Sequence, residues 1–290
     1  MKTRFIVNLR SGHAARALAE VRTHAAAHGA GVVLTERARH ASELAQQAIA
    51  DGCELIVAVG GDGTMNETAS ALIDTPATLG LIPCGSGDGL GRHLRIHGSV
   101  TRALGILRDG QPQHIDTGRA DGHPFFTVAG LGFEAEISSR FNRLAHRGFW
   151  RYVTTIAQTL RTWEPQDFVI THSGGTETLR AFTLAVANCA QYGNGVRVAP
   201  GAQIDDGLLD LCVLAPVTLW NAVPLVGRLF AGTLAGSSNA TLRRGDRFVV
   251  ERAAPGLLHT DGETHEGGTR LEFVVRPASL RVMCPADSDT

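Results

Sequence analysis

Apolar and polar residues follow two different patterns along the chain, and the change comes near residue 117. In the first part, short apolar runs alternate with longer segments whose apolar residues recur at helical spacing. The run at 55–59 is continuous and rich in β-branched residues, which is typical of a strand buried in a parallel sheet. Strands are expected at 5–7, 32–34, 55–59 and 79–82, and helices at 14–28, 41–50, 65–73, after Gly89 and at 100–108. The pattern predicts a doubly wound α/β domain covering residues 1–117.

From residue 118 onward the apolar runs are short and alternating, and Gly and Asx turns separate them. Strands are expected at 125–128, 168–171, 182–187, 208–214, 248–251 and 271–275, and amphipathic helices at 150–162 and 219–234. The pattern predicts a mainly β second domain covering residues 118–290. A last strand near 280–284 either completes this domain or returns to the first.

Composition removes several classes of function. The net charge of −1 gives no general attraction to nucleic acid, and no apolar run is long enough to cross a membrane. We therefore expect a cytoplasmic protein that does not bind nucleic acid. Lys2 is the only lysine, so neither a P-loop kinase nor a protein kinase could place its phosphate-binding lysine. Backbone amides and arginines must hold any phosphate.

The strongest candidate for chemistry is the segment Gly60 to Glu67, which lies between an expected buried strand and an expected helix. Glycines allow successive amides to turn toward an anion, and a helix N-terminus adds partial positive charge, so this position favours a phosphate. Asp62 beside a polyphosphate implies Mg²⁺ or a proton transfer, because the like charges would otherwise repel. The alternative is a tight turn with an aspartate cap.

A second glycine-rich segment, Pro83 to Gly89, occupies the same position after the next strand. Because ligands of doubly wound sheets bind beyond the carboxyl ends of the strands, the two segments are expected to face one nucleotide. Alone, this second segment would be an ordinary helix entrance.

The sequence GGDGTMNE at 60–67 resembles the glycine-rich signature of the diacylglycerol kinase catalytic-domain family, which includes bacterial lipid kinases, sphingosine kinases and ceramide kinases. Further similar segments follow in order at 8–12, 115–118, 132–135, 192–195, 199–200, 205–210 and 261–263. The resemblance implies a nucleotide domain followed by a β-sandwich-like domain, with ATP, Mg²⁺ and a lipid substrate meeting between them.

Carried over residue by residue, the resemblance implies a set of ATP-binding positions on both glycine-rich segments and beyond them. These positions are Asn8, Thr35, Gly60, Gly61, Gly63, Thr64, Glu67, Gly85, Ser86, Gly87 and Arg151. An arginine suits this role because its planar fork of donors matches a phosphate. For Arg151, the alternative is a solvated helix face.

Phosphoryl transfer requires a carboxylate that accepts the proton of the attacking hydroxyl. Glu263, in Asp261-Gly262-Glu263, and Asp62 are the two candidates. We favour Glu263 as the base because Asp62, nearer the phosphates, suits metal contact better. Taken alone, Asp261-Gly262-Glu263 would be a hairpin turn.

In bacterial relatives an aspartate matching Asp206 holds a structural Mg²⁺, which would make Gln203 and Leu208 carbonyl ligands. The alternative is a turn before the strand at 208–214. Two more aspartates stand in family-like segments: Asp116 on the segment that leaves the first domain, and Asp88 in the second glycine-rich segment.

Departures from the family pattern affect the substrate prediction. The second segment has Ser86-Gly87-Asp88-Gly89 where diacylglycerol kinases have Thr-x-Asn-Asp, and its Gly-Ser-Gly is closer to the sphingosine kinase version. Glu134 replaces an aspartate and Leu9 a proline. The lipid is therefore left open between diacylglycerol, a sphingoid base and a related lipid.

Two other functions compete with a lipid kinase: an NAD kinase, whose family also carries Gly-Gly-Asp-Gly, and a noncatalytic nucleotide or lipid sensor. A lipid kinase without an anchor must contact the membrane transiently, and the basic and aromatic region 141–152 is one candidate, with an ordinary amphipathic lid as the alternative. The oligomeric state is left open, with a homodimer as one alternative.

Overall fold

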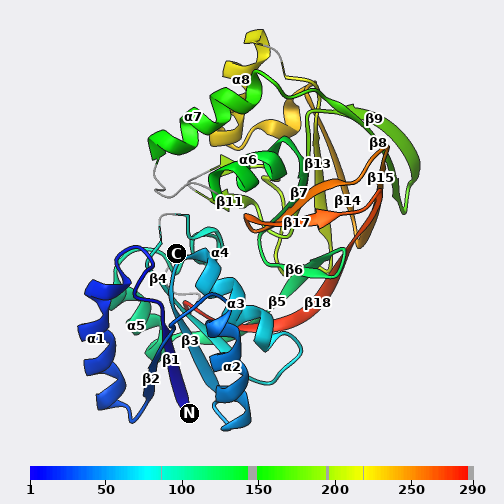
Figure 1. Cartoon of the computed structure of the whole chain (residues 1–290). Coiled ribbons are helices and arrows are strands. Elements are labelled where there is room, and N and C mark those ends of the chain that lie inside the picture. Colours follow the sequence, from blue (N-terminus) through cyan, green and yellow to red (C-terminus); the bar gives the residue numbers. More distant parts are fainter. Residues whose placement is uncertain (86, 143–148, 194–195, 218, 287–290) are drawn as a thin grey trace. The chain divides into compact units, whose positions relative to one another are not determined.

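The computed structural model of the chain describes residues 1–85, 87–142, 149–193, 196–217 and 219–286 (Figure 1). The chain forms two compact units. Unit 1 contains residues 1–117 together with the segment from Pro277 onward, and unit 2 runs from Gly118 to Arg276. The chain therefore passes between the units twice.

Unit 1 is built on a parallel sheet in the order β2-β1-β3-β4-β18. Its strands are β1 (Thr3–Val7), β2 (Gly31–Leu34), β3 (Leu55–Gly60), β4 (Thr78–Pro83) and the last residues of β18 (Arg270–Cys284). Its helices are α1 (Ala14–Ala27), α2 (His40–Ala50), α3 (Asp62–Leu72), α4 (Gly89–His93) and α5 (Val100–Asp109). Helices α1 and α5 cover one face of the sheet, and α2 and α3 cover the other (Figure 1). Every residue of β3 and β4 is buried, as their continuous apolar runs predict.

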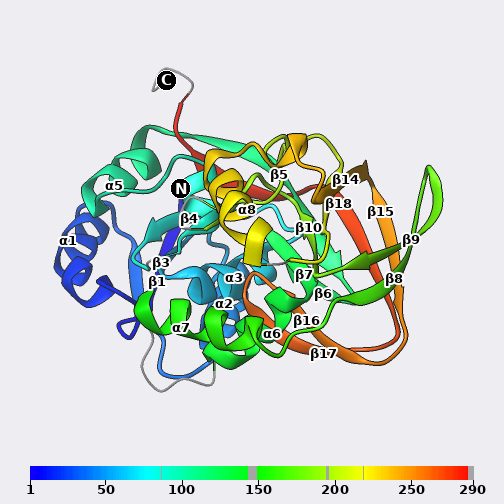
Figure 2. The ribbon, with the colours of Figure 1, turned by 90° about the horizontal axis from the view of Figure 1, so that it is seen from above.

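Unit 2 is a sandwich of two mainly antiparallel sheets. One sheet has the order β14-β13-β10-β7-β16-β17, and the other includes β18, β15, β8 and β9, which lie side by side in Figure 2. The strands not yet given are β5 (Gln111–Ala120), β6 (His123–Phe125), β7 (Val128–Gly132), β8 (Gln166–His172), β9 (Gly175–Ala181), β10 (Thr183–Ala187), β11 (Gln191–Gly193), β12 (Val196–Arg197), β13 (Leu209–Leu214), β14 (Ala240–Gly245), β15 (Arg247–Arg252), β16 (Gly256–Thr260) and β17 (Glu263–Gly267). The helices are α6 (Phe133–Asn142), α7 (Phe149–Leu160), α8 (Leu219–Ala231) and a 3₁₀ turn at Leu234–Gly236.

Alternation along β13 shows how the sandwich is built. Leu209, Leu211 and Val213 enter the core between the two sheets, which also contains Phe168 and Phe248 from the opposite sheet. The residues between them point to the other face, since side chains alternate along a strand. There Cys212 and Leu214 form a second cluster with Leu225 of α8. The six-stranded sheet is therefore buried on both faces where α8 covers it.

Several boundaries differ from the sequence predictions. Helix α3 begins at Asp62 instead of 65, so Asp62 to Thr64 form its first turn and are not a loop. The family-like segment at 132–135 leads into α6, a helix that was not predicted. The strands expected at 271–275 and near 280–284 are one 15-residue strand, β18, which continues through Pro277 and the left-handed Ala278, at φ 50°. Its end pairs with β4, so the last strand returns to unit 1.

Candidate active-site residues in the two units

The first glycine-rich segment joins β3 directly to α3. Gly61 is the N-cap, with extended backbone at φ −97° and ψ −171°, and no side chain caps the helix. The first amides of a helix have no acceptor within it, so those of α3 remain available to an anion. A Cβ placed on Gly63 would meet nothing within 4 Å, which leaves open space beside this first turn.

Two residues after β1 hold the segment in place. The side-chain amide of Asn8 donates to Oγ1 of Thr64 at 3.0 Å, and the backbone amide of Gly61 donates to Oγ of Ser11 at 2.7 Å. Asn8 and Thr64 were predicted to bind ATP, and the structure brings them together. Ser11 was not singled out as a site residue, although it stands in the family-like segment 8–12.

The second glycine-rich segment packs against the first at backbone distance. A Cβ on Gly85 would lie 2.9 Å from Cα of Gly61, and a Cβ on Gly12 would lie 1.7 Å from the carbonyl oxygen of Cys84. Backbone atoms cannot move aside as a flexible side chain can, so only glycine fits at these positions. The two segments therefore lie against each other, and their common contact with one nucleotide stays a prediction. Ser86 lies outside the described residues.

The carboxylate of Asp62 joins the two segments. Its Oδ2 accepts the amide of Asp88 at 3.2 Å and its Oδ1 accepts the amide of Gly89 at 3.1 Å, at the start of α4. Asp62 therefore orients the second segment, and each of its oxygens keeps a lone pair for a further partner. Metal contact by Asp62 stays a prediction.

Asp88 is the second carboxylate of this site. It is 6% exposed, its backbone is left-handed at φ 48°, and its Oδ1 has no hydrogen-bond partner among the described residues. Burial, and then the charge of Asp62, raise the pKa of Asp88 to about 7. A cation between the two carboxylates would remove this repulsion and satisfy the unpaired oxygen, so the residues fit Mg²⁺.

Glu67, predicted to bind ATP, has both carboxylate oxygens engaged elsewhere. They accept the amides of Arg39 at 3.0 Å and Ala41 at 3.1 Å, at the N-terminus of α2. The structure thus gives Glu67 the role of fixing the chain after Thr35, whose own amide donates to the carbonyl of Val7 at 2.9 Å. Direct contact of Glu67 or Thr35 with ATP stays a prediction.

Two further predicted residues do not lie at the glycine-rich segments as far as the structure describes them. Arg151 belongs to α7, but its side chain lies outside the described residues. Asp116 is buried in β5, where its Oδ1 accepts the amide of Ala278 at 2.7 Å. Asp116 therefore anchors the returning segment of β18 to unit 1.

In unit 2, Asp261 and Gly262 form the two-residue turn between β16 and β17. Both have positive φ, 49° and 85°, and Thr260 pairs with Glu263 across the turn. The Asp261 carboxylate accepts the amides of Phe126, Thr127 and Val128 at 2.8, 2.8 and 3.0 Å, and also the Thr127 hydroxyl. Burial raises the pKa of Asp261, and these four bonds oppose the shift. The segment is thus a hairpin turn, and Asp261 fixes it to the loop before β7.

Glu263 follows that turn as the first residue of β17, with an exposed side chain. His259 lies in β16, just before the turn. Its Nδ1 accepts the amide of Gly262 at 3.4 Å, and its Nε2 lies 3.3 Å from Oε2 of Glu134 in α6. His259 is fully buried. His259 was not among the residues predicted for the site; the only signal in the sequence was its position two residues before Asp261.

The residues of the predicted structural Mg²⁺ site do not fit a cation. Oδ1 of Asp206 accepts the amide of Leu208 at 3.0 Å, and Oδ2 is paired with the guanidinium of Arg244. Nε of Arg244 also lies 3.6 Å from Oδ2 of Asp210. An arginine is thus paired with the aspartate that was expected to bind the metal. The described residues hold no cluster of three His, Cys, Asp or Glu side chains suited to a metal ion.

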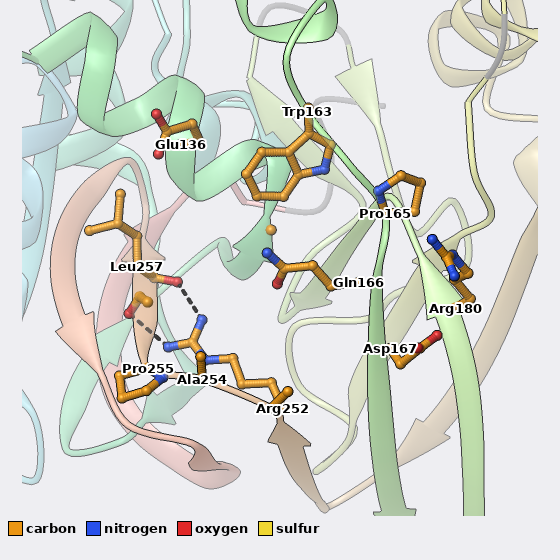
Figure 3. Close-up of a pocket in the computed structure, with 13 residues that line it drawn as sticks. Glu136, Trp163, Pro165, Gln166, Asp167, Arg180, Arg252, Ala254, Pro255 and Leu257 are labelled. Atoms are coloured by element: carbon orange, nitrogen blue, oxygen red, sulfur yellow. Dashed lines mark hydrogen bonds between the residues drawn. The ribbon is translucent and has the colours of Figure 1, made fainter.

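A cavity of about 480 Å³ opens in unit 2 between α6, the start of β8 and the 252–257 segment (Figure 3). Two of the polar side chains that line it already have partners. Arg252 donates to four carbonyls, those of Gly256, Leu257, Gly267 and Gly268, and the Trp163 indole donates to the carbonyl of Phe182 at 2.9 Å. None of the predicted site residues lines this cavity, so we assign it no part in the chemistry.

Comparison with known families shows which family carries the two glycine-rich segments. Residues 2–120 match the model of the diacylglycerol kinase catalytic domain, and residues 127–284 match the YegS C-terminal NAD kinase beta sandwich-like domain. The chain belongs to the diacylglycerol kinase catalytic-domain family. The predicted family, the α/β plus β-sandwich fold and the enzyme class, a lipid kinase, are thereby confirmed.

Individual members of the diacylglycerol kinase family are similar over nearly their full length. A Pseudomonas fluorescens protein named "Probable lipid kinase YegS-like" is 34% identical over 279 residues, 94% of this chain and 91% of its own. A Mycobacterium tuberculosis diacylglycerol kinase is 29% identical over 98% of this chain and 95% of its own. In fold, the chain resembles a Bacillus anthracis diacylglycerol kinase, with a TM-score of 0.76, 19% identity and coverage of 100% and 98%.

Proposed function

We propose that the chain transfers the γ-phosphate of ATP to a hydroxyl group of a diacylglycerol or sphingoid-base lipid. The observation that carries the proposal is the joined surface of the two glycine-rich segments, in which the Asp62 carboxylate holds the second segment against the first. The open first turn of α3 suits the phosphates of a nucleotide, and the family supplies the reaction class.

In this proposal the residues of unit 1 bind and orient ATP. The amides of the first turn of α3 donate to phosphate oxygens, and Asn8 and Ser11 keep that turn in place through their bonds to Thr64 and Gly61. Asp62 and Asp88 would hold Mg²⁺, which would supply positive charge to neutralise the phosphates. Among the described residues, Oδ1 of Asp88 has no hydrogen-bond partner, which supports this assignment.

Glu263 of unit 2 acts as the general base. Its carboxylate accepts the proton of the lipid hydroxyl, whose oxygen attacks the γ-phosphorus while the bond to the bridging oxygen of ADP breaks. The turn that carries Glu263 is fixed on one side by Asp261 and contacted on the other by His259. In this proposal unit 1 supplies the nucleotide-binding segments and unit 2 supplies the base.

The second glycine-rich segment does not distinguish between two classes of lipid substrate. Asp88 and Gly89 stand where diacylglycerol kinases have Asn and Asp, so one carboxylate is present but shifted by one position. A sphingoid base or a related lipid is therefore as compatible with the loop as diacylglycerol.

The test is transfer of labelled γ-phosphate from ATP and Mg²⁺ to diacylglycerol, sphingosine, ceramide, monoacylglycerol and NAD. We expect labelled lipid from the wild-type chain and a loss of about 10²- to 10⁴-fold in Glu263→Gln. Glu266→Gln is the matched control, because Glu266 is also exposed on β17. Labelled NAD in place of labelled lipid would contradict the proposal, and binding of ATP without any product would indicate a sensor.

A further inference from the structure

Among its described side chains, helix α8 has one buried and one exposed apolar stripe. Leu225 is buried in the cluster that covers the outer face of the six-stranded sheet, and Leu229 packs against the same cluster. The neighbouring positions Val226 and Phe230 point away from it, with 50% and 57% of their surface exposed. Because residues four apart share a helix face, Val226 and Phe230 form one exposed apolar stripe.

The composition of α8 does not suit a helix that faces only water. A surface helix normally carries polar residues on the side opposite the core, whereas a helix that is apolar all round is buried or lies against a membrane. The sequence of α8 is LWNAVPLVGRLFA, in which Asn221 and Arg228 are the only polar side chains. The outward stripe is therefore an unusual feature for a chain with 43% hydrophobic residues overall.

The charge around α8 is positive. From 211 to 245 the sequence contains Arg228, Arg243 and Arg244 and no aspartate or glutamate, although the whole chain has a net charge of −1. Arg228 is exposed, and no carboxylate among the described residues pairs with it; it donates to the carbonyl of Thr233 at 3.2 Å. The exposed Arg197 lies beside Gly232, at the end of the helix.

From these observations we propose that Val226 and Phe230 of α8, flanked by Arg228 and Arg197, dock the chain onto a bilayer that contains anionic phospholipids. This inference rests on the proposed function, because a lipid substrate is held in a membrane. It places the contact on α8, whereas the region 141–152 suggested by the sequence includes residues outside the described part of the chain. No helix within the described ranges is long and apolar enough to cross a bilayer.

An anionic membrane explains the surface better than a second copy of the chain. A stable protein interface buries about 800 Å² on each partner, and two apolar side chains cannot supply that area. Apolar side chains together with nearby arginines are the two signals that reversible membrane binding requires.

The binding test uses vesicles without ATP or substrate, so its result does not depend on catalysis. In flotation with vesicles of phosphatidylcholine and about one third phosphatidylglycerol, we expect the wild-type chain to partition to the lipid. Val226→Ser with Phe230→Ser should reduce partitioning at least tenfold, and Arg228→Gln should weaken it only on anionic vesicles. Leu160→Ser is the matched control, because Leu160 is an exposed leucine of α7, 39% exposed, and its loss should change nothing.

A second measurement locates the contact. All five native cysteines are buried, so Phe230→Cys can carry a polarity-sensitive dye. We expect its emission to shift to shorter wavelength on anionic vesicles. An unshifted emission, or equal binding by wild type and the double serine variant, would overturn the proposal. Loss of a dimer in the double variant, measured by light scattering, would assign α8 to a second copy instead.

A kinase assay separates this proposal from the proposed function. The double serine variant should lose activity on lipid in anionic vesicles but keep wild-type activity on a short-chain lipid dispersed in detergent micelles. Equal loss on both substrates would show that α8 supports catalysis and not docking. Vesicle binding by a wild-type chain that phosphorylates no lipid would contradict the lipid kinase function while leaving the docking surface supported.

Discussion

His259 and Glu134 link helix α6 to the turn that carries the proposed base. Nε2 of His259 lies 3.3 Å from Oε2 of Glu134, and Nδ1 accepts the amide of Gly262 at 3.4 Å. Because Nδ1 accepts a hydrogen bond, Nε2 is the ring nitrogen that can donate to Glu134. The ring thus holds Gly262 from one side while Asp261 holds the turn from the other.

We therefore expect His259→Ala to lower kcat by about 10- to 100-fold, because the turn before Glu263 loses one of its two supports. The KM for ATP should change less. His259→Asn should restore part of the rate, since its side chain can also accept from Gly262. Steady-state kinetics on each variant, with its thermal midpoint as a check of folding, measures this. A rise in KM for ATP at constant kcat would show that the pair serves nucleotide binding.

Asp88 makes stability depend on pH. Its pKa is raised to about 7 by burial and by Asp62, so the folded chain holds this proton more tightly than the unfolded chain, whose aspartate has the ordinary value of 3.8. Stability is therefore lost as pH rises from about 4 to 7. Asp88→Asn should be about 1–2 kcal/mol more stable than wild type at pH 8, after allowance for partial solvent screening, and similar at pH 4.

Mg²⁺ should restore the stability lost at high pH if it binds between the carboxylates of Asp62 and Asp88. Saturating Mg²⁺ should raise the thermal midpoint of the wild-type chain at pH 8 and leave Asp88→Asn nearly unchanged. An equal response in both chains would place the cation elsewhere. Asp109→Asn is a suitable control, because Asp109 is an exposed aspartate paired with Arg108 on α5.

Arg244 pairs with the carboxylates of both Asp206 and Asp210. Its positive charge should make a structural metal unnecessary. We expect chelation by EDTA to leave the thermal midpoint of the wild-type chain unchanged. Arg244→Met should lower the midpoint by several degrees, because two carboxylates are left without a cation, and Mg²⁺ should then restore part of the loss. Arg243→Met is the matched control: it breaks the pair with Glu177 on β9 and should give no Mg²⁺ response. A wild-type midpoint that falls in EDTA would contradict the assignment.

Two glycines should separate stability from nucleotide binding. Gly85→Ala should destabilise the chain, because its Cβ would lie 2.9 Å from Cα of Gly61. Gly63→Ala should be neutral or slightly stabilising, since its Cβ has open space and alanine favours a helix by about 1 kcal/mol. If phosphates occupy that space, Gly63→Ala should nevertheless weaken ATP binding at least tenfold by calorimetry. Unchanged affinity would mean that ATP does not approach this turn.

The sequence allowed the parallel sheet of unit 1 to be predicted because each buried strand is a continuous apolar run followed by a helical pattern. The first glycine-rich segment was placed correctly between β3 and α3, although Asp62 proved to be the first residue of the helix. In unit 2 the prediction missed α6, because the sequence Gly-Phe-Glu-Ala looks like a turn and its helix-forming residues come only afterwards.

Other site contacts could not be predicted because they join residues far apart in the chain. Glu67 meets the α2 N-terminus 28 residues earlier in the chain, and Arg244 meets Asp206 across 38 positions. Composition and local spacing carry no record of such pairs. His259 is the same case, since nothing near it in the sequence distinguishes a buried histidine from an exposed one.

Because strand β18 comes last in the chain, the order of synthesis determines when each unit can complete its folding. Its last residues pair with β4, so the nucleotide sheet is completed by residues that leave the ribosome after all of unit 2. Unit 2 is a continuous segment and can fold as soon as it has emerged, whereas unit 1 must keep the edge of β4 unpaired until then. Unit 2 is in effect an insertion within unit 1, and a chain cut short at Arg276 would expose that edge and be prone to aggregate.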